Sequence, residues 1–254
     1  MNKLPAFQTI KHALKAVFQF RNAGTRIALS WILILTIVRI FDRYFSGAAN
    51  STGDPAGIMT FQPTEVIITA FSIVIFSSIA VNWHRYILLD EITPSEKIFR
   101  LDRLVWSYAG RTVLIMLVTL VPVIIFSTAV LAVLPNLRIA LFVPLVIAGI
   151  YIMRLSVALP AIALERSDFG IAAALQITRG NNLQFAALLG LNALLFIATL
   201  LLMLIVLSIV GSVSEMAARI FAVVLSVPIS LFLSLFSVSL LSSLYGFFVE
   251  KRKF

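Results

Sequence analysis

The stretch Arg154–Asn182, RLSVALPAIALERSDFGIAAALQITRGNN, joins three kinds of segment in one passage. An apolar run ends near Pro160, a short mixed segment follows around Glu165, and a second apolar run begins after Asn182. This order is typical of a chain that leaves a membrane, runs along its surface and enters the membrane again. The rest of the sequence repeats the same order with variations.

The composition indicates a protein whose solvent is a lipid bilayer. The chain has 254 residues, 61% of them hydrophobic, and its mean hydropathy is +1.05, whereas soluble domains are nearer half apolar. A backbone in lipid must satisfy its own hydrogen bonds in helices or a closed barrel. The apolar runs are continuous and not alternating, which favours helices. We therefore predict an all-α membrane protein, with residues 1–254 forming a single integral membrane domain.

Six apolar runs are long enough to cross a membrane as transmembrane helices. They cover about 27–46, 64–83, 112–133, 139–160, 183–209 and 219–247. In the last turns of the first run, Arg39 precedes Asp42 by one helical turn, so that the two side chains can pair.

The distribution of positive charge predicts the topology. With the N-terminus placed in the cytoplasm, all but four of the 20 Lys and Arg residues fall on the inner side. The exceptions are Arg39, Arg43, Arg138 and Arg219. Because Lys and Arg concentrate in cytoplasmic loops, we expect a multi-pass protein of the bacterial cell inner membrane with both termini cytoplasmic. The net charge of +9 is then attributed to these loops and to anionic lipid headgroups, and not to nucleic acid.

Three shorter amphipathic segments are predicted to lie along the cytoplasmic surface of the membrane as interfacial helices. The first falls within residues 1–26, with Lys11 and Lys15 away from its apolar stripe. That stripe consists of Phe7, Ile10, Leu14, Val17 and Phe18. The alternative for this segment is a helix packed on the protein's own loops. The N-terminus lacks the apolar core and cleavage site of a signal peptide, so none is expected.

The second surface helix is predicted to begin at Thr93-Pro94-Ser95-Glu96, because Thr93 suits the N-cap and Pro94 the first helical position. Its apolar stripe consists of Ile98, Leu101, Val105 and Tyr108.

The third surface helix is predicted over 169–179, with Ser167 or Asp168 as its cap and Gly180 as its stop. Surface helix, span, outer turn and span then occur three times, which predicts three helical-hairpin repeats. The alternative is that any six-span protein with charged inner loops shows this order.

Two stretches resemble a known group of proteins. The segment Ala80–Glu91, AVNWHRYILLDE, resembles a "WHR…LL.E" segment of poorly characterised bacterial inner-membrane proteins, especially alphaproteobacterial ones. Arg154–Ser156, Leu159–Ala163 and Thr178–Asn181 resemble a segment shared by those proteins and the YciC-like and glycerophosphodiesterase membrane-domain group. The resemblance implies a six-helix membrane domain and no particular activity. The soluble catalytic domain of glycerophosphodiesterases has no counterpart here, so its phosphodiester chemistry is not expected.

Eight charged or titratable residues are predicted to gather at the inner membrane interface. They are His84, Arg85, Asp90, Glu91, Arg154, Glu165, Arg166 and Arg179. Such a cluster can anchor surface helices to the ends of spans, or it can contact lipid headgroups or a protein partner.

A stripe of serines in the sixth apolar run is the second candidate site. Its members, at spacings of one helical turn, are Ser226, Ser230, Ser234 and Ser237. The stripe can line a pathway or a groove for lipid headgroups. Alternatively, its small side chains let two helices pack closely in lipid.

No pattern of catalytic residues is evident. The chain has no cysteine and only two histidines, in different segments, so no metal or other cofactor is expected. The serines have no adjacent base. We interpret the chain as a non-enzymatic scaffold, assembly partner or lipid-interacting module, with anionic lipids and a protein or a second copy as partners. A transporter or permease subunit is the alternative, and a membrane-embedded lipid enzyme ranks last.

Overall fold

The computed structural model describes residues 3–49, 63–94, 97–133, 141–166 and 168–252, with only the backbone described at 43–49 and 63. Its helices are α1 (Ala6–Gln19), α2 (Arg21–Ala49), α3 (Pro63–Leu89), α4 (Arg103–Val133), α5 (Phe142–Ser156), α6 (Leu159–Ala163), α7 (Ile171–Ile177), α8 (Asn182–Val213) and α9 (Glu215–Phe248). Six candidate spans, with α5 and α6 together forming one, are long and apolar enough to cross a membrane. The predicted all-α class with six candidate spans is thus confirmed.

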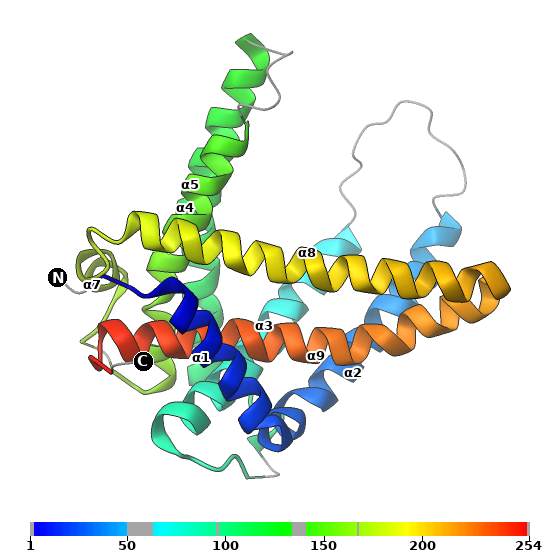
Figure 1. Ribbon diagram of the computed structural model, residues 1–254, viewed down its shortest axis with the longest axis horizontal. Helices are drawn as coiled ribbons and strands as arrows, with labels where there is room; N and C mark the ends of the chain where they lie inside the picture. Colours follow the sequence, from blue (N-terminus) through cyan, green and yellow to red (C-terminus); the bar gives the residue numbers. More distant parts are fainter. Residues whose placement is uncertain (1–2, 50–62, 95–96, 134–140, 167, 253–254) are drawn as a thin grey trace.

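The long helices form three consecutive pairs that leave a shared base in different directions (Figure 1). In this view α4 and α5 rise to the top, α8 and α9 run across, and α2 and α3 lie behind them. The short helices α1, α6 and α7 lie at the base. Helix α9 is the central element, because it contacts α1, α2, α3, α6 and α8.

The buried core lies in the base, where the three pairs meet. Trp83 and His84 of α3 and Leu244 and Tyr245 of α9 are completely buried there. Farther from the base, the pairs diverge and their apolar side chains are exposed, among them Leu117, Ile124 and Ile125 of α4 and Leu202, Ile205 and Ile209 of α8. Lipid tails are as apolar as these side chains, so a bilayer solvates them without cost.

A glycine allows α2 to approach the base closely. A methyl group at Gly24 would lie 2.6 Å from Leu235 Cδ1 and 3.1 Å from Trp83 Cζ3. Small residues permit such close helix contacts in membrane proteins. Gly24 therefore positions α2 against both α3 and α9.

Helix α1 is present, but its buried face differs from the predicted apolar stripe. Phe7 and Phe18 are 70% and 62% exposed and share a helical face with Lys11 and Lys15. The buried residues are Thr9, Ile10, Ala13, Ala16 and Val17. Two of them are alanines, whose small side chains let α1 pack directly on α8 and α9. The alternative of a helix packed on the protein itself therefore describes the buried face, although helices and not loops form the contact.

The predicted second surface helix is wrong, because no α-helix lies between α3 and α4 in the residues described there. The chain makes only a turn, in which the N–H of Lys97 donates to the carbonyl of Pro94 at 3.0 Å. Two residues of the predicted capping signal, Ser95 and Glu96, lie outside the described residues, as do Arg138 and Ser167.

Asp102 explains where the helix starts instead. Its carboxylate accepts hydrogen bonds from the backbone N–H of Leu104 at 3.1 Å and of Val105 at 3.3 Å. Side-chain oxygens in this position satisfy the free N–H groups of a first helical turn. Val105 and Tyr108, predicted for the surface helix, therefore belong to the first turns of α4, which is one of the candidate spans.

The third surface helix is shorter than predicted. Helix α7 begins after Gly170, and Asp168 does not cap it. The helix ends at Ile177 with Thr178 as its C-cap, so Gly180 does not cap it. Gly180 lies in the turn that follows and adopts the left-handed region with φ of 80°. Short helices precede α2 and α8 but not α4, so the predicted threefold repeat is not confirmed.

Candidate functional site

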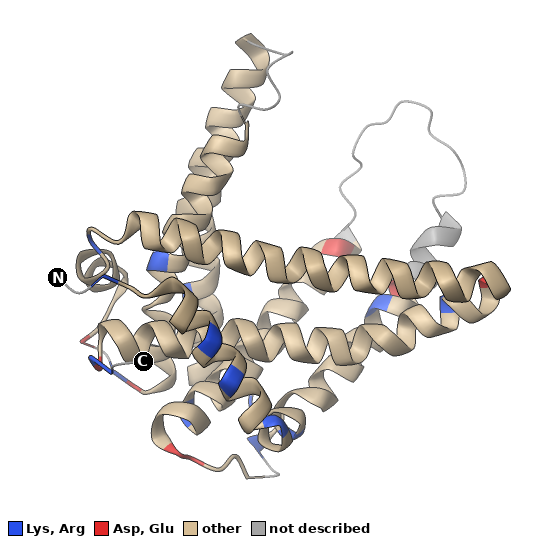
Figure 2. Ribbon diagram, in the orientation of Figure 1, with Lys and Arg blue, Asp and Glu red and all other residues tan. Residues whose placement is uncertain are grey.

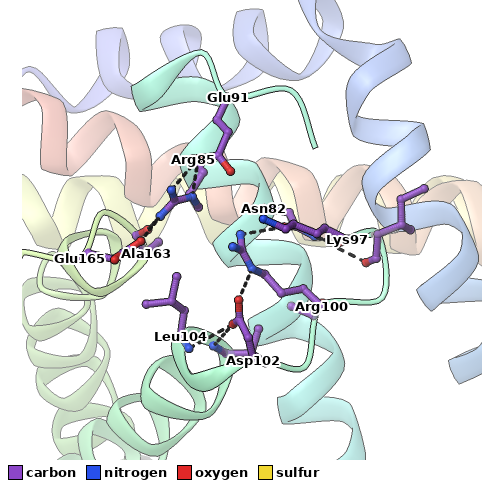
Figure 3. A network of polar contacts seen from close by, with 12 residues as sticks. Asn82, Arg85, Glu91, Lys97, Arg100, Asp102, Leu104, Ala163 and Glu165 are labelled. Atoms are coloured by element: carbon purple, nitrogen blue, oxygen red, sulfur yellow. Dashed lines mark hydrogen bonds and ion pairs between the residues drawn. The ribbon is translucent and has the colours of Figure 1, made fainter. Parts of the chain in front are cut away.

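The predicted inner charged cluster is divided into several separate contacts. Figure 3 shows Arg85 of α3 pointing toward two acidic residues. Its guanidinium donates to Glu91 at 2.7 Å, to Glu165 at 2.8 Å and to the carbonyl of Ala163 at 2.9 Å. The hydrogen bond from Arg85 lowers the pKa of Glu91, so this carboxylate remains ionised at neutral pH. Arg85 thus ties the end of α3 to the end of α6.

A second arginine network, which the sequence did not predict, holds the loop before α4. Arg100 is 9% exposed and donates to Asp102 at 2.6 Å and to Asn82 Oδ1 at 3.4 Å. The amide of Asn82 donates to the carbonyl of Lys97 at 3.0 Å (Figure 3). Burial acts to raise the pKa of Asp102, but the hydrogen bond and charge of Arg100 outweigh it and lower that pKa.

Arg154 connects the three elements of the stretch that opened the sequence. It is 6% exposed and donates to Thr178 Oγ1 at 3.0 Å, Asn182 Oδ1 at 2.9 Å and the carbonyl of Leu175 at 2.9 Å. These acceptors belong to α7, its C-cap and the start of α8, whereas Arg154 lies near the end of α5. All three acceptors are uncharged, so the side chain acts as a structural tie.

The two histidines contact serines of α9 that sequence reasoning did not single out. His84 is hydrogen-bonded to Ser242 at 2.8 Å and to Tyr108 at 3.2 Å. His12 of α1 is hydrogen-bonded to Ser243 at 2.9 Å. Burial, together with the charges of Lys15 and Arg252, lowers the pKa of His12. These serines lie on the base-facing side of α9, away from the predicted stripe.

The other members of the inner cluster lie apart from these networks. Arg166 donates to the hydroxyl of Tyr245 at 3.2 Å, whereas Asp90 and Arg179 are exposed at the surface. Asp90 adopts φ of 53°, which turns the chain so that the following residue can reach Arg85. The inner residues therefore do not converge on one open site, and most of them are bonded to the base itself.

The predicted serine stripe lies beside an open groove. A groove of about 1050 Å³ lies between α2 and α9, with further walls from α3 and α8. Ser226, Ser230 and Ser234 line it. Ser237 does not, and its side chain is exposed elsewhere on α9. Ser226 and Ser234 also donate to carbonyls of their own helix at 2.7 and 2.6 Å, which leaves their oxygens able to accept hydrogen bonds.

The walls of the groove are mostly apolar, and two of its three charged residues lie at the start of α9. The apolar lining includes Ile32, Leu35, Ile40, Phe76, Met203 and Leu207. Glu215 and Arg219, one turn apart on α9, form an exposed ion pair at 2.5 Å. The groove is therefore amphipathic, because hydroxyl and charged groups of α9 face walls that are mostly apolar.

Arg39 of α2 also lines the groove. Within the part of the chain that the structure describes, it has neither a hydrogen bond nor an ion pair, so the predicted pair with Asp42 is not formed. Sequence reasoning placed Arg39 at the outer end of a span but did not connect it with the serine stripe. The connection depends on α2 and α9 being neighbours, which no local pattern encodes.

Fold and groove together define an all-α protein with six helices able to cross a membrane and an amphipathic groove between two helix pairs. No protein-family model, curated protein or solved structure matches the chain. The resemblance to bacterial inner-membrane proteins therefore stays a prediction, and the function must be argued from the geometry.

Proposed function

We propose that this protein is a non-enzymatic integral membrane protein that binds lipid in the groove between α2 and α9. The observation that carries the proposal is the groove's lining, which combines apolar walls with a stripe of hydroxyls and charges on α9. A lipid has the same division between chains and headgroup. The volume of about 1050 Å³ is at the upper end of the range for small-molecule sites.

The residues around the groove also support a non-enzymatic role. Both histidines hydrogen-bond to serines in the base, and neither lines the groove. The groove serines therefore have no imidazole base beside them, and serine nucleophiles require such an activating group. In this proposal the hydroxyls bind and do not react.

We further propose that the base faces the cytoplasmic leaflet of a bacterial inner membrane. Figure 2 shows most Lys and Arg residues around the base and fewer toward the far ends of the helix pairs. The exposed face of α1 carries Lys11 and Lys15 between Phe7 and Phe18, a pattern that suits anionic headgroups and the interface below them. A protein partner or a second copy of the chain would bind to this same side.

Single cysteines are expected to test this orientation cleanly, because the chain has no cysteine of its own. Asp168→Cys and Gln176→Cys lie at exposed positions of the base and should react with a membrane-impermeant thiol reagent only from the cytoplasmic side. Ser212→Cys, exposed near the far end of α8, should react only from the opposite side. Labelling of Asp168→Cys from outside intact cells would show that the proposed orientation is wrong.

Filling the groove is expected to displace the bound lipid. Ser230→Leu adds a branched apolar side chain to the lining, and overpacking of this kind typically costs about 1–3 kcal/mol, or a loss of roughly fivefold or more in affinity. Native mass spectrometry of the protein released from a mild detergent would measure the lipid retained per chain. Ser237→Leu is the matched control, because Ser237 is exposed on the same helix outside the groove. Equal retention by both variants would contradict the proposal.

A transporter or permease subunit is the second candidate, because the same groove lies between helix pairs at membrane depth, where transporters hold their substrates. It ranks lower because a transport pathway would have to continue through the base. The groove lining ends at Ile32 and Ser234, and none of the completely buried aromatic residues of the base lines it. Reaction of Ser230→Cys with a water-soluble thiol reagent from both sides of the membrane would favour the transporter over the lipid-binding protein.

A further inference from the structure

We propose that the groove binds a phospholipid from the leaflet far from the base, with the lipid phosphate on the guanidinium of Arg39. This inference rests on the proposed lipid-binding function and names the class of lipid and the residue that recognises it.

The charge of Arg39 is the first argument. Arg39 lines the groove with no partner in the described residues, although ionised side chains in membrane helices are almost always paired. A guanidinium binds phosphate through two parallel hydrogen bonds, which makes arginine the side chain best suited to this group. A lipid phosphate would therefore supply the partner that the protein does not.

The balance of charge within the groove agrees with this ligand. Its ionised lining residues are Arg39, Arg219 and Glu215, and the last two already form an ion pair. One positive charge, that of Arg39, remains. A phosphodiester carries one negative charge, so a phospholipid would neutralise the one unpaired charge of the groove.

The depth of Arg39 also fits. At 1.5 Å per residue, Arg39 lies about 20 Å along α2 from Arg26 near the base, which is roughly two-thirds of the hydrocarbon thickness of a bilayer. A long arginine side chain can extend from this depth to the headgroup region. The apolar residues Leu35 and Ile32 follow Arg39 toward the base, in the direction in which the acyl chains of such a lipid would run.

The same lining argues for a lipid and against free phosphate. A small anion would leave most of a groove of about 1050 Å³ and its apolar walls unfilled. Acyl chains cover these walls, and the phosphate then occupies only the end at Arg39.

The experiment compares two lipids that differ in the phosphate headgroup. Full-length protein in detergent is titrated with phosphatidylglycerol and with diacylglycerol of the same chains, and native mass spectrometry measures the binding that Ser230→Leu weakens. Arg39→Gln should weaken phosphatidylglycerol binding by about tenfold or more, the effect of losing charge-assisted hydrogen bonds, and leave diacylglycerol binding unchanged. Arg39→Lys should retain an intermediate affinity. Arg103→Gln, the same substitution at an exposed residue of the base, should bind both lipids as the wild type does.

Three results would overturn the proposal while leaving the lipid groove itself intact. These are wild-type phosphatidylglycerol binding by Arg39→Gln, an equal loss of both lipids in that variant, and displacement of wild-type lipid by millimolar glycerol phosphate, which lacks acyl chains. By contrast, binding that Ser230→Leu does not reduce would refute the proposed function, whatever Arg39 does. Thermal unfolding of Arg39→Gln checks the fold, which should be unaffected because Arg39 is exposed and unpaired in the described residues.

Discussion

Replacing Arg154 with leucine is expected to lower the free energy of unfolding by about 2–4 kcal/mol, because the three charge-assisted hydrogen bonds of a buried guanidinium are lost together. The acceptors, Thr178, Asn182 and the carbonyl of Leu175, lie at 2.9–3.0 Å from the guanidinium. Leucine offsets part of this loss in the free energy of unfolding, because it removes the cost of burying a charge. It cannot satisfy the acceptors, of which Thr178 is completely buried. Denaturation of the purified protein in mixed micelles, followed by circular dichroism, would measure the change.

The control for this substitution lies in the same stretch. Arg179 is exposed at the end of α7, so Arg179→Leu removes an equal charge and is expected to change stability by no more than about 0.5 kcal/mol. Arg154→Lys should remain destabilised, because a single ammonium on a flexible chain cannot reproduce the three directions of the guanidinium. If Arg154→Leu and Arg179→Leu unfold alike, Arg154 is not the tie between α5, α7 and α8.

The same stretch also indicates which features a sequence alone can predict. The apolar runs on either side of it, and the turn at Gly180, depend on residues within a few turns of one another, and both are present in the structure. The partners of Arg154 are up to 28 positions away along the chain. Their meeting depends on how α5, α7 and α8 pack, so sequence reasoning predicted an interface residue without predicting its contacts.

The prediction of the second surface helix was wrong for a related reason. Thr93-Pro94 is a reasonable start signal, but such signals are weak compared with tertiary contacts. Arg100 and Asn82 hold the loop that follows, and Asp102 caps the next helix. Asp102 precedes an apolar run, which is itself a recognisable signal for the N-terminus of a helix. The correct start was thus present in the sequence, but it competed with an earlier one.

For the groove, local spacing predicted the serine stripe but not its surroundings. Ser237 follows Ser234, the last residue of α9 that lines the groove, so it lies beyond the end of the groove. Arg39 belongs to the groove only because the first and last candidate spans are neighbours. Contact between segments so far apart in the chain is a property of the whole fold. The periodicity within one helix cannot predict it.

Trp83→Ala is expected to have the largest effect on stability, a loss of about 3–5 kcal/mol. Trp83 is completely buried where α2, α3 and α9 meet, and its indole N–H donates to Ser239 at 2.9 Å. Alanine would leave a cavity beside Gly24, which has no side chain to fill it. Because helices in a membrane are already surrounded by apolar lipid, the loss arises from packing and the hydrogen bond, and not from transfer of the indole out of water.

Trp106 provides the matched control, since it is a tryptophan on α4 that is 57% exposed. Trp106→Ala should lower stability by about 1 kcal/mol or less, because no enclosed cavity forms. Trp83→Phe fills most of the cavity and loses only the hydrogen bond to Ser239, so it should cost roughly 1–2 kcal/mol. Denaturant titration of all three variants in the same detergent gives the order directly. Equal losses for Trp83→Ala and Trp106→Ala would mean that stability does not come from the base, where α9 holds the helix pairs together.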